Sequence, residues 1–271
     1  MGLPNNIKKV TVDLATNLRR IWEMSRFEFR LLYRESRLGM VWAILSPLVQ
    51  IGAYWFVFGV GLRERGNVGD LPYLVWMVPG ITAWFFLTKA LPGGSGELRN
   101  KATMLSRVTI GPYLLLASRL LAQLFEHIGM LIIMFVILLA NGWRPDVYAF
   151  NLVYYVVASF CFALAFDMVF SVLTLIAEDF KRVLSMVLRL LFFLMPILWM
   201  PEPGKMDWFF TIQKYNPLYY VVKGYRDSLL YQTPFWRDTE TLLIFWAITV
   251  VLYLIGCQWQ SRIRDRIADF V

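Results

Sequence analysis

The amino-acid sequence predicts an all-α integral membrane protein that crosses the membrane six times. Of its 271 residues, 58% are hydrophobic and only 17% are charged, and the mean hydropathy is +0.54. A water-soluble chain of this length would need more polar residues to cover its surface. Six apolar stretches approach the roughly 20 residues that a helix needs to cross a bilayer. We expect them to form a single transmembrane domain, residues 1–271.

The predicted spans are residues 41–62, 72–91, 116–140, 147–176, 183–200 and 241–260. Eight Lys and Arg residues precede Gly39, and further ones occupy the second and fourth links and the C-terminal tail. The segments on this side hold more than twice as many Lys and Arg residues as those on the other side. By the positive-inside rule they face the cytoplasm. The sequence therefore predicts a multi-pass protein of the bacterial cytoplasmic membrane with both termini cytoplasmic.

Residues 1–38 form a cytoplasmic amphipathic N-terminus ahead of spans one to five, residues 39–200. Within it, the charged residues of 18–37 recur at helical spacing as one stripe: Arg19, Glu23, Arg26, Arg30, Arg34 and Arg37. Apolar residues fill the opposite face: Leu18, Ile21, Trp22, Phe29 and Leu32. Such a helix lies in the headgroup plane and meets anionic membrane lipid. The pattern fits both a simple anchor and a helix that also docks a partner.

Residues 201–240 are too apolar for an ordinary outer loop and too short for two spans. The runs 206–210 and 218–222 are separated by Asn216-Pro217, which is typical of a turn. We expect two half-helices that re-enter the outer leaflet, where irregular backbone is tolerated only against protein or water. The sixth span and a cytoplasmic tail follow, residues 241–271.

Recognisable catalytic and cofactor-binding patterns are missing from the sequence. No G-x-x-x-x-G-K-[ST] motif is present, so the chain has no phosphate-binding loop of its own. With one histidine and no Cys/His cluster, we predict neither a metal site nor catalytic residues. The net charge of +8 lies beside apolar spans and indicates membrane lipid as a partner, not nucleic acid. Glu178-Asp179 could serve an acid/base role, but next to Lys181-Arg182 a helix cap is the commoner meaning.

Two sequence patterns together resemble a known transporter family. The run from Arg30 to Leu48 resembles the RY…LG-x-x-W-x-x-x-x-P start of the first span in ABC-2 type permeases. Tyr215-Asn216-Pro217-Leu218, followed by Gly224-Tyr225-Arg226, is similar to their NP…G-x-R outer segment. The linker from Gly93 to Pro112 matches their second inner connection in position and length. Across the whole chain the resemblance is closest to the polysaccharide and teichoic acid exporters of that family.

The resemblance implies a homodimer bound to two cytoplasmic nucleotide-binding ATPase subunits, which hold ATP and Mg. By itself the chain would then be no enzyme. The N-terminal helix and the 93–112 connection would face the ATPase, and the coupling residues would be Glu97, Arg99, Asn100, Lys101 and Met104. The first and fifth spans would line a channel between the two copies. The cargo would be a lipid-linked teichoic acid or polysaccharide.

Residue chemistry suggests where such a cargo would be contacted. Guanidinium groups bind pyrophosphate well, and Arg34 and Arg37 lie where the first span begins. The alternative is that these arginines only set topology. Aromatic faces let a sugar chain slide without fixed hydrogen bonds. The candidates on the first and fifth spans are Trp42, Tyr54, Phe58, Phe192, Phe193 and Trp199.

Three charged residues are predicted to lie at similar depth inside the membrane. Glu126 and Arg189 each lie about 10 Å inside a basic residue at the inner end of their span, and Asp167 lies about 15 Å from Ala177. An isolated charge at that depth is costly, so such residues pair or face a wet cavity. We expect Arg189 to pair with Asp167 or Glu126 as a clasp between spans, with His127 as a neutral neighbour.

Two other functions are consistent with parts of the sequence. An ABC-2 exporter of a drug or small hydrophobic molecule would share the fold and differ only in cargo. A membrane-embedded glycan or lipid transferase belongs to another class and would need acid/base or metal residues that the sequence does not offer. A nucleotide-binding ATPase that co-purifies with the chain would separate the exporters from the transferase.

Overall fold

The computed structural model describes residues 3–34, 39, 41–61, 67–107, 110–200 and 207–263, and it is helical nearly throughout. Five helical segments are long and apolar enough to cross a membrane: Val41–Gly61, Tyr73–Ser95, Pro112–Ala140, Val147–Ile176 and Thr239–Ile263. They coincide with five of the six predicted spans. The chain is therefore a multi-pass α-helical membrane protein, as predicted.

In chain order the elements are α1 (Leu3–Thr16), α2 (Leu18–Arg34), α3 (Val41–Tyr54), the π-helix η1 (Trp55–Gly61), β1 (Asn67–Val68), β2 (Leu71–Pro72), α4 (Tyr73–Ser95), α5 (Glu97–Asn100), α6 (Ala102–Leu105), α7 (Pro112–Ala140), the 3-10 helix η2 (Val147–Phe150), α8 (Asn151–Ile176), α9 (Asp179–Leu194), α10 (Asp207–Gln213), α11 (Pro217–Leu229) and α12 (Thr239–Ile263). The strands form one short antiparallel hairpin, in which Asn67 pairs with Pro72 and Val68 with Leu71.

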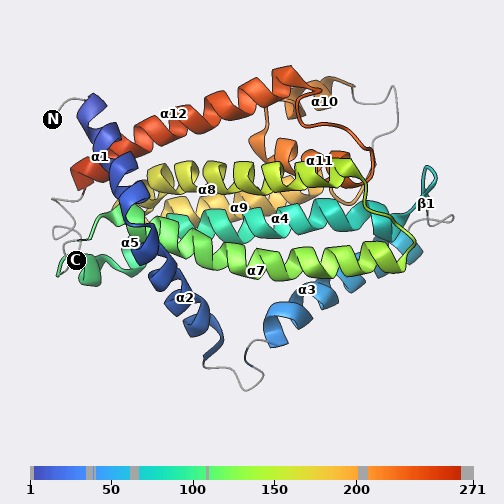
Figure 1. Cartoon of the computed structure of the whole chain (residues 1–271), viewed down its shortest axis with the longest axis horizontal. Coiled ribbons are helices and arrows are strands. Elements are labelled where there is room, and N and C mark those ends of the chain that lie inside the picture. The colour runs from blue at the N-terminus through green and yellow to red at the C-terminus, as the bar shows by residue number, and fades with distance from the viewer. Residues whose placement is uncertain are drawn as a thin grey trace.

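The long helices run side by side in one bundle (Figure 1). We call its two ends the α5 end, where α1, α5 and the last turn of α12 lie, and the hairpin end, where β1–β2 lies. Helices α4, α8 and α11 form the centre, and most of their buried apolar side chains belong to one core that includes Trp84, Phe162 and Tyr225, while Met168, Val172 and Leu175 of α8 belong to a second core. Helix α3 lies at the edge of the bundle and diverges from it (Figure 1).

The fifth predicted span, 183–200, is corrected by the structure. Helix α9 begins earlier, at Asp179, and ends at Leu194. Its 16 residues rise only about 24 Å, less than the thickness of the hydrocarbon core. Proline disfavours the helical conformation of the residue before it, and Met195, which precedes Pro196, is extended with φ −77° and ψ 147°. The rest of the predicted span, residues 195–200, is irregular backbone packed into the bundle.

The predicted amphipathic N-terminal helix is present as α2. The residues of its charged stripe that the structure describes, Arg19, Glu23, Arg26, Arg30 and Arg34, are exposed, while Ile21, Ser25 and Glu28 are buried. It packs against α7, where Trp22 and Phe29 both contact the Phe125 ring edge to face, at 5.1 and 5.9 Å. Helix α2 is thus fastened to the bundle by its buried residues and by the Trp22 and Phe29 rings, whereas Leu18 of the predicted apolar face is 66% exposed.

The two short helices predicted between 201 and 240 are α10 and α11. They meet at Asn216-Pro217, where the Asn216 side chain accepts a hydrogen bond from the Leu218 amide at 3.0 Å and Pro217 occupies the first turn. This combination of an Asn cap and an N-terminal proline is a strong helix start. Most of α11 is buried between α4 and α8, so it belongs to the core of the bundle.

Candidate functional site

One face of the bundle is built by α3 and α9, and we call it the α3–α9 face. The two helices meet near their C-terminal ends, where the rings of Tyr54 and Phe192 lie 5.2 Å apart. Helix α9 turns Leu184, Leu188 and Phe192 inward at helical spacing. Its other side, which includes Met186, Leu190 and Phe193, is exposed. Most of α3 is exposed as well, so this face is a broad surface that the single chain leaves uncovered.

Exposed polar side chains distinguish the α3–α9 face from the exposed faces of α7 and α12. Gln50 is exposed near the middle of α3, and Arg189 is exposed well inside α9. On α7 and α12, the exposed residues at comparable positions are all apolar: Ile128, Ile132, Val136, Leu243, Ala247, Val250, Val251 and Ile255. Lipid solvates the second kind of surface well and the first poorly. The α3–α9 face is therefore suited to water, a polar cargo or another protein.

Four of the six predicted channel aromatics lie close together on this face. Tyr54 and Phe192 touch as described, and Phe193 follows with 64% of its surface exposed, against 7% for Phe192. The Trp199 indole N–H donates to the Phe193 carbonyl at 3.0 Å. Phe58 lies one turn beyond Tyr54 and is half-buried. Trp42 is exposed twelve residues before Tyr54, roughly 18 Å along the helix, so it does not join this group.

Arg226 of α11 holds the irregular segment that follows α9. Its buried guanidinium donates to the carbonyls of Pro196 and Ile197, both at 2.6 Å, and to the Trp76 carbonyl at 3.2 Å. It also stacks over the Trp76 ring at 3.7 Å. Carbonyls freed by the end of a helix inside a membrane must find donors within the protein. Arg226 supplies those donors and fixes the end of α9 against α4.

The predicted clasp of Arg189 with Asp167 or Glu126 is wrong. Among the described residues, Arg189 forms no ion pair, and its Nε donates to the Ser185 carbonyl at 3.2 Å on its own helix. The reason is helix phase: Arg189 follows the inward-facing Leu188 and therefore points away from the core. Glu126 pairs instead with Lys89 at 2.6 Å, which joins α7 to α4. Asp167 is fully buried in α8, and its carboxylate occupies the space that a Cβ at Gly94 would fill.

His127 lies in the core as a hydrogen-bonding residue. Its Nε2 is 2.8 Å from the Tyr225 hydroxyl, and its ring packs on Phe86 with centroids 4.8 Å apart. These contacts join α7 to α11 and α4. His127 is therefore not the predicted neighbour of an Arg189 clasp; its hydrogen-bond partner is Tyr225.

At the α5 end, part of the predicted coupling segment is held inside the protein. Glu97 is buried and lies 2.5 Å from Lys101 Nζ, which also pairs with Glu28 of α2. Burial raises the pKa of Glu28, and Lys101 offsets only part of that effect. Burial by itself would lower the pKa of Lys101, but the two carboxylates outweigh it and raise the pKa. This ion cluster locks the α5–α6 connection onto the N-terminal helix.

The remaining coupling candidates point outward. Asn100 is exposed, and Met104 keeps 40% of its surface accessible. Arg99 reaches Glu178 at 3.8 Å and the Leu175 carbonyl at 3.4 Å, which connects α5 to the link between α8 and α9. The segment therefore has an inner side that fixes it and an outer side that is free to contact a partner.

Of the two arginines predicted to meet a lipid pyrophosphate, Arg34 is exposed at the last position of α2. Arg37 lies outside the described residues. The charged stripe that leads to Arg34 faces away from α7, so a phosphate at the membrane surface could reach Arg34 without any rearrangement of α2.

Sequence reasoning missed Gln50, Lys89 and the role of Arg226. Gln50 carried a usable signal, because a lone amide in a 20-residue apolar run is costly unless it faces protein or water. Arg226 was visible within the Gly224-Tyr225-Arg226 motif, but its acceptors are contributed by residues 76, 196 and 197, far away in the sequence. Only the folded chain shows that pairing.

Comparison with known proteins adds a family match. A family model described as "ABC-2 type transporter" matches residues 19–230. Similar proteins include an O-antigen export system permease protein RfbA of Myxococcus xanthus, 24% identical over 249 residues, and one of Klebsiella pneumoniae, 21% identical over 248 residues. Each alignment covers 90% of this chain and 92% of the relative.

Proposed function

The chain belongs to the ABC-2 type transporter family, and on that premise we propose that it is the membrane subunit of an ATP-driven exporter of a lipid-linked surface glycan. The observation that supports a glycan as the cargo is the α3–α9 face, which combines the exposed rings of Phe193 and Trp42 with the exposed polar side chains of Gln50 and Arg189. Aromatic faces and isolated polar groups suit a hydrated sugar chain. The similar full-length proteins are named as O-antigen export permeases, which favours a polysaccharide over a teichoic acid as the polymer.

In this proposal two copies face each other through their α3–α9 faces and enclose the path of the polymer. The family resemblance supports the homodimer, and the uncovered state of α3 is consistent with it. The α5 end faces the cytoplasm, where the basic stripe of α2 meets anionic lipid. The hairpin end then faces outward, so both termini are cytoplasmic. Arg34, at the end of the stripe, is placed to meet the lipid pyrophosphate that carries the polymer.

ATP is bound and hydrolysed by a separate subunit that docks at the α5 end. The outward side of the coupling segment, with Asn100 and Met104, offers the contact, and the Glu28–Lys101–Glu97 cluster transmits its movement to α2. Arg99 extends the connection to α9 through Glu178. A push on α5–α6 would therefore reach both the N-terminal helix and the translocation face.

A drug or small hydrophobic molecule is the second candidate cargo, and exposed arginine on the translocation face disfavours it. An apolar molecule gains nothing from Arg189 or Gln50 and would leave their hydrogen-bonding groups unpaired. Export of radiolabelled polymer into the medium or onto the cell surface separates the two cargoes directly.

The coupling assignment is tested with a matched pair of methionines at opposite ends of the bundle. Met104 is 40% exposed at the α5 end, and Met200 is 45% exposed near the hairpin end. We expect M104E to lower polymer-stimulated ATP hydrolysis by the complex at least about fivefold. M200E should leave it unchanged. Equal rates in M104E and the wild-type complex, or ATP hydrolysis by the purified chain alone, would contradict the proposal.

A further inference from the structure

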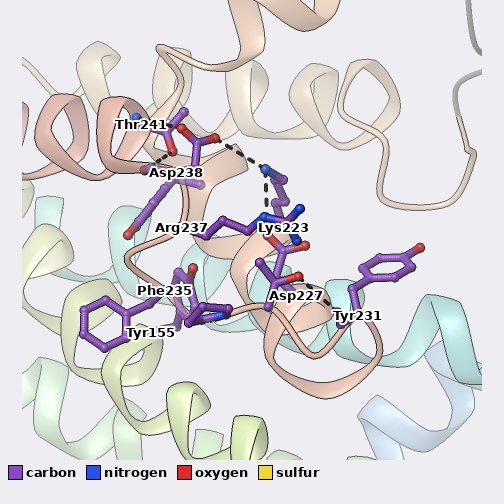
Figure 2. Close-up of a pocket in the computed structure, with 11 residues that line it drawn as sticks. Tyr155, Lys223, Asp227, Tyr231, Phe235, Arg237, Asp238 and Thr241 are labelled. Carbon is purple, nitrogen blue, oxygen red and sulfur yellow. Dashed lines mark hydrogen bonds and ion pairs between the residues drawn. The ribbon is translucent and has the colours of Figure 1, made fainter.

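A cavity lies within the single chain at the hairpin end, apart from the α3–α9 face. Its volume is about 490 Å³, within the range of small-molecule sites. Its walls come from α11, the first turns of α8 and the turn that leads into α12 (Figure 2). Residues distant in the sequence therefore meet here, and the translocation mechanism described above uses none of them.

Aromatic rings form one side of the cavity and are fixed in place. Tyr155 and Tyr220 pack with ring centroids 5.4 Å apart, and Phe235 stacks on Tyr154 at 4.1 Å. The Tyr154 hydroxyl lies 3.0 Å from that of Tyr220 and accepts from the Trp246 indole at 2.8 Å. A rigid aromatic wall binds a flat apolar face at low entropic cost.

Charged groups form the other side of the cavity. Lys223 Nζ lies between two carboxylates, 3.8 Å from Asp227 and 3.6 Å from Asp238 (Figure 2). Both distances exceed those of a hydrogen bond, so all three groups keep donors or acceptors for a ligand. Arg237 also lines the cavity and forms no ion pair with any described residue. With Lys223 and Arg237 facing Asp227 and Asp238, the formal charges cancel.

This balance narrows the class of ligand. A phosphate would meet two carboxylates as well as two cations, and an apolar molecule would bury four charged groups without partners. A polyhydroxylated ring satisfies both sides, because its hydroxyls donate to carboxylates and accept from Lys and Arg while its C–H face lies on an aromatic ring. The cavity therefore matches a neutral sugar unit.

The rim of the cavity is held in an unusual conformation. Gln232 has a positive φ of 49°, which is uncommon for a residue other than glycine. The turn is stabilised on either side of it, because the Thr233 amide donates to the Asp227 carbonyl at 2.9 Å and the Tyr231 amide to the Arg226 carbonyl at 3.2 Å. Strained backbone that the surroundings enforce is concentrated at binding sites.

We propose that this cavity is a saccharide-binding site that holds one unit of a neutral glycan at the hairpin end of each subunit. The site is distinct from the translocation face and shares with the proposed function only the class of cargo. It would retain a segment of the emerging chain after that segment has left the path between the subunits.

Direct binding tests the site independently of transport. The probe is the oligosaccharide mixture released by mild acid from the surface polysaccharide of the source cells, added to the purified chain in lipid nanodiscs. Saturation-transfer NMR should show binding to the wild-type chain, and R237Q and D238N should each weaken it at least about tenfold. R144Q removes an exposed arginine outside the cavity and serves as the matched control. Unchanged thermal midpoints show that the variants fold.

Several results would overturn the proposal. They are no binding of the oligosaccharides to the wild-type chain, equal binding by the wild-type chain and both cavity variants, or preferential binding of glycerol phosphate. The last result would reassign the cavity to a phosphate-bearing headgroup or polymer. Surface display of the polymer, measured in parallel, keeps the two claims apart. If the polymer reaches the cell surface but the oligosaccharides do not bind the chain, only the saccharide-binding site is rejected. If the oligosaccharides bind but no polymer reaches the surface, only the export function is rejected.

Discussion

The continuous segment α3–η1 (Val41–Gly61) and helix α4 are both long and apolar enough to cross a membrane, yet one is exposed and the other is buried. In the most apolar 18-residue window of each, 83% of the residues of α4 are buried, against 17% of those of the segment α3–η1. Hydropathy does not distinguish them, since their values are 1.5 and 1.6. The difference shows that α4 belongs to a self-sufficient bundle, whereas α3 belongs to a surface completed by something outside the chain.

The exposed side of α12 sharpens this comparison, because it is uncovered but purely apolar between Leu243 and Ile255. Lipid can cover such a surface. The α3–α9 face, with Gln50 and Arg189, needs a polar environment at the same depth. We therefore distinguish three regions: the packed centre, the apolar exposed side of α7 and α12, and the α3–α9 face, which we propose as the translocation face.

Removing the guanidinium of the packed centre should have the largest effect on stability. R226M leaves the carbonyls of Trp76, Pro196 and Ile197 without their donor, at a cost of about 3–5 kcal/mol. We expect the thermal midpoint in detergent to fall by roughly 10 °C. R144M, at an exposed arginine, should change stability by less than about 0.5 kcal/mol. Similar midpoints for the two variants would show that Arg226 does not hold the end of α9.

Two adjacent phenylalanines separate packing from transport on one helix. F192A removes a ring buried against Tyr54 and Trp84 and should destabilise the subunit by about 2–4 kcal/mol. F193A removes an exposed ring and should leave stability nearly unchanged while slowing export of the polymer. Thermal midpoints and surface polymer are measured on both variants. Full export by F193A would remove this ring from the path.

The structure also shows how much of the fold and of the candidate site could be predicted from the sequence. Periodicity and length predicted five of the six spans, α2 and the pair α10–α11, because each depends on local residue order. Pro196 predicted a break near the end of α9. The position where the helix ends could not be predicted, because the irregular segment that follows is held by Arg226, which is distant in the sequence. Arg189 was misplaced because depth along a helix can be counted, whereas the direction of a side chain depends on which face the neighbouring helices bury.

The ion cluster at the α5 end should give a smaller, pH-dependent effect. K101M leaves two buried carboxylates without their shared cation, at a cost of about 1–3 kcal/mol near neutral pH. The pKa of Glu28 is already raised in the folded protein, so its contribution to stability is present below about pH 4.5 and is lost as the pH rises through the raised value. Because Lys101 lowers the pKa of Glu28, its removal makes this loss of stability with rising pH larger. The midpoint difference between K101M and wild type should therefore widen from about pH 5 to about pH 8, and a constant difference would contradict the cluster.

The smallest effect on stability is expected from a matched pair of glycines. Neither Gly52 on α3 nor Gly129 on α7 has any atom within 4 Å of where a Cβ would lie. G52L and G129L should each change the stability of the single chain by less than about 0.5 kcal/mol. Export should fall only in G52L, because lipid accommodates a leucine on α7 whereas a facing subunit or cargo does not. Equal export by the two variants would assign α3 to lipid.

Access of water to the α3–α9 face tests the distinction between the regions most directly. Cysteines are placed singly at Gln50, Arg189, Ile132 and Val250, in a chain whose Cys161 and Cys257 are replaced by alanine. Membranes with the assembled transporter are treated with a membrane-impermeant thiol reagent from both sides. We predict labelling at positions 50 and 189 and none at positions 132 and 250. Equal resistance at all four positions would place α3 and α9 against lipid and contradict a translocation face on this side of the bundle.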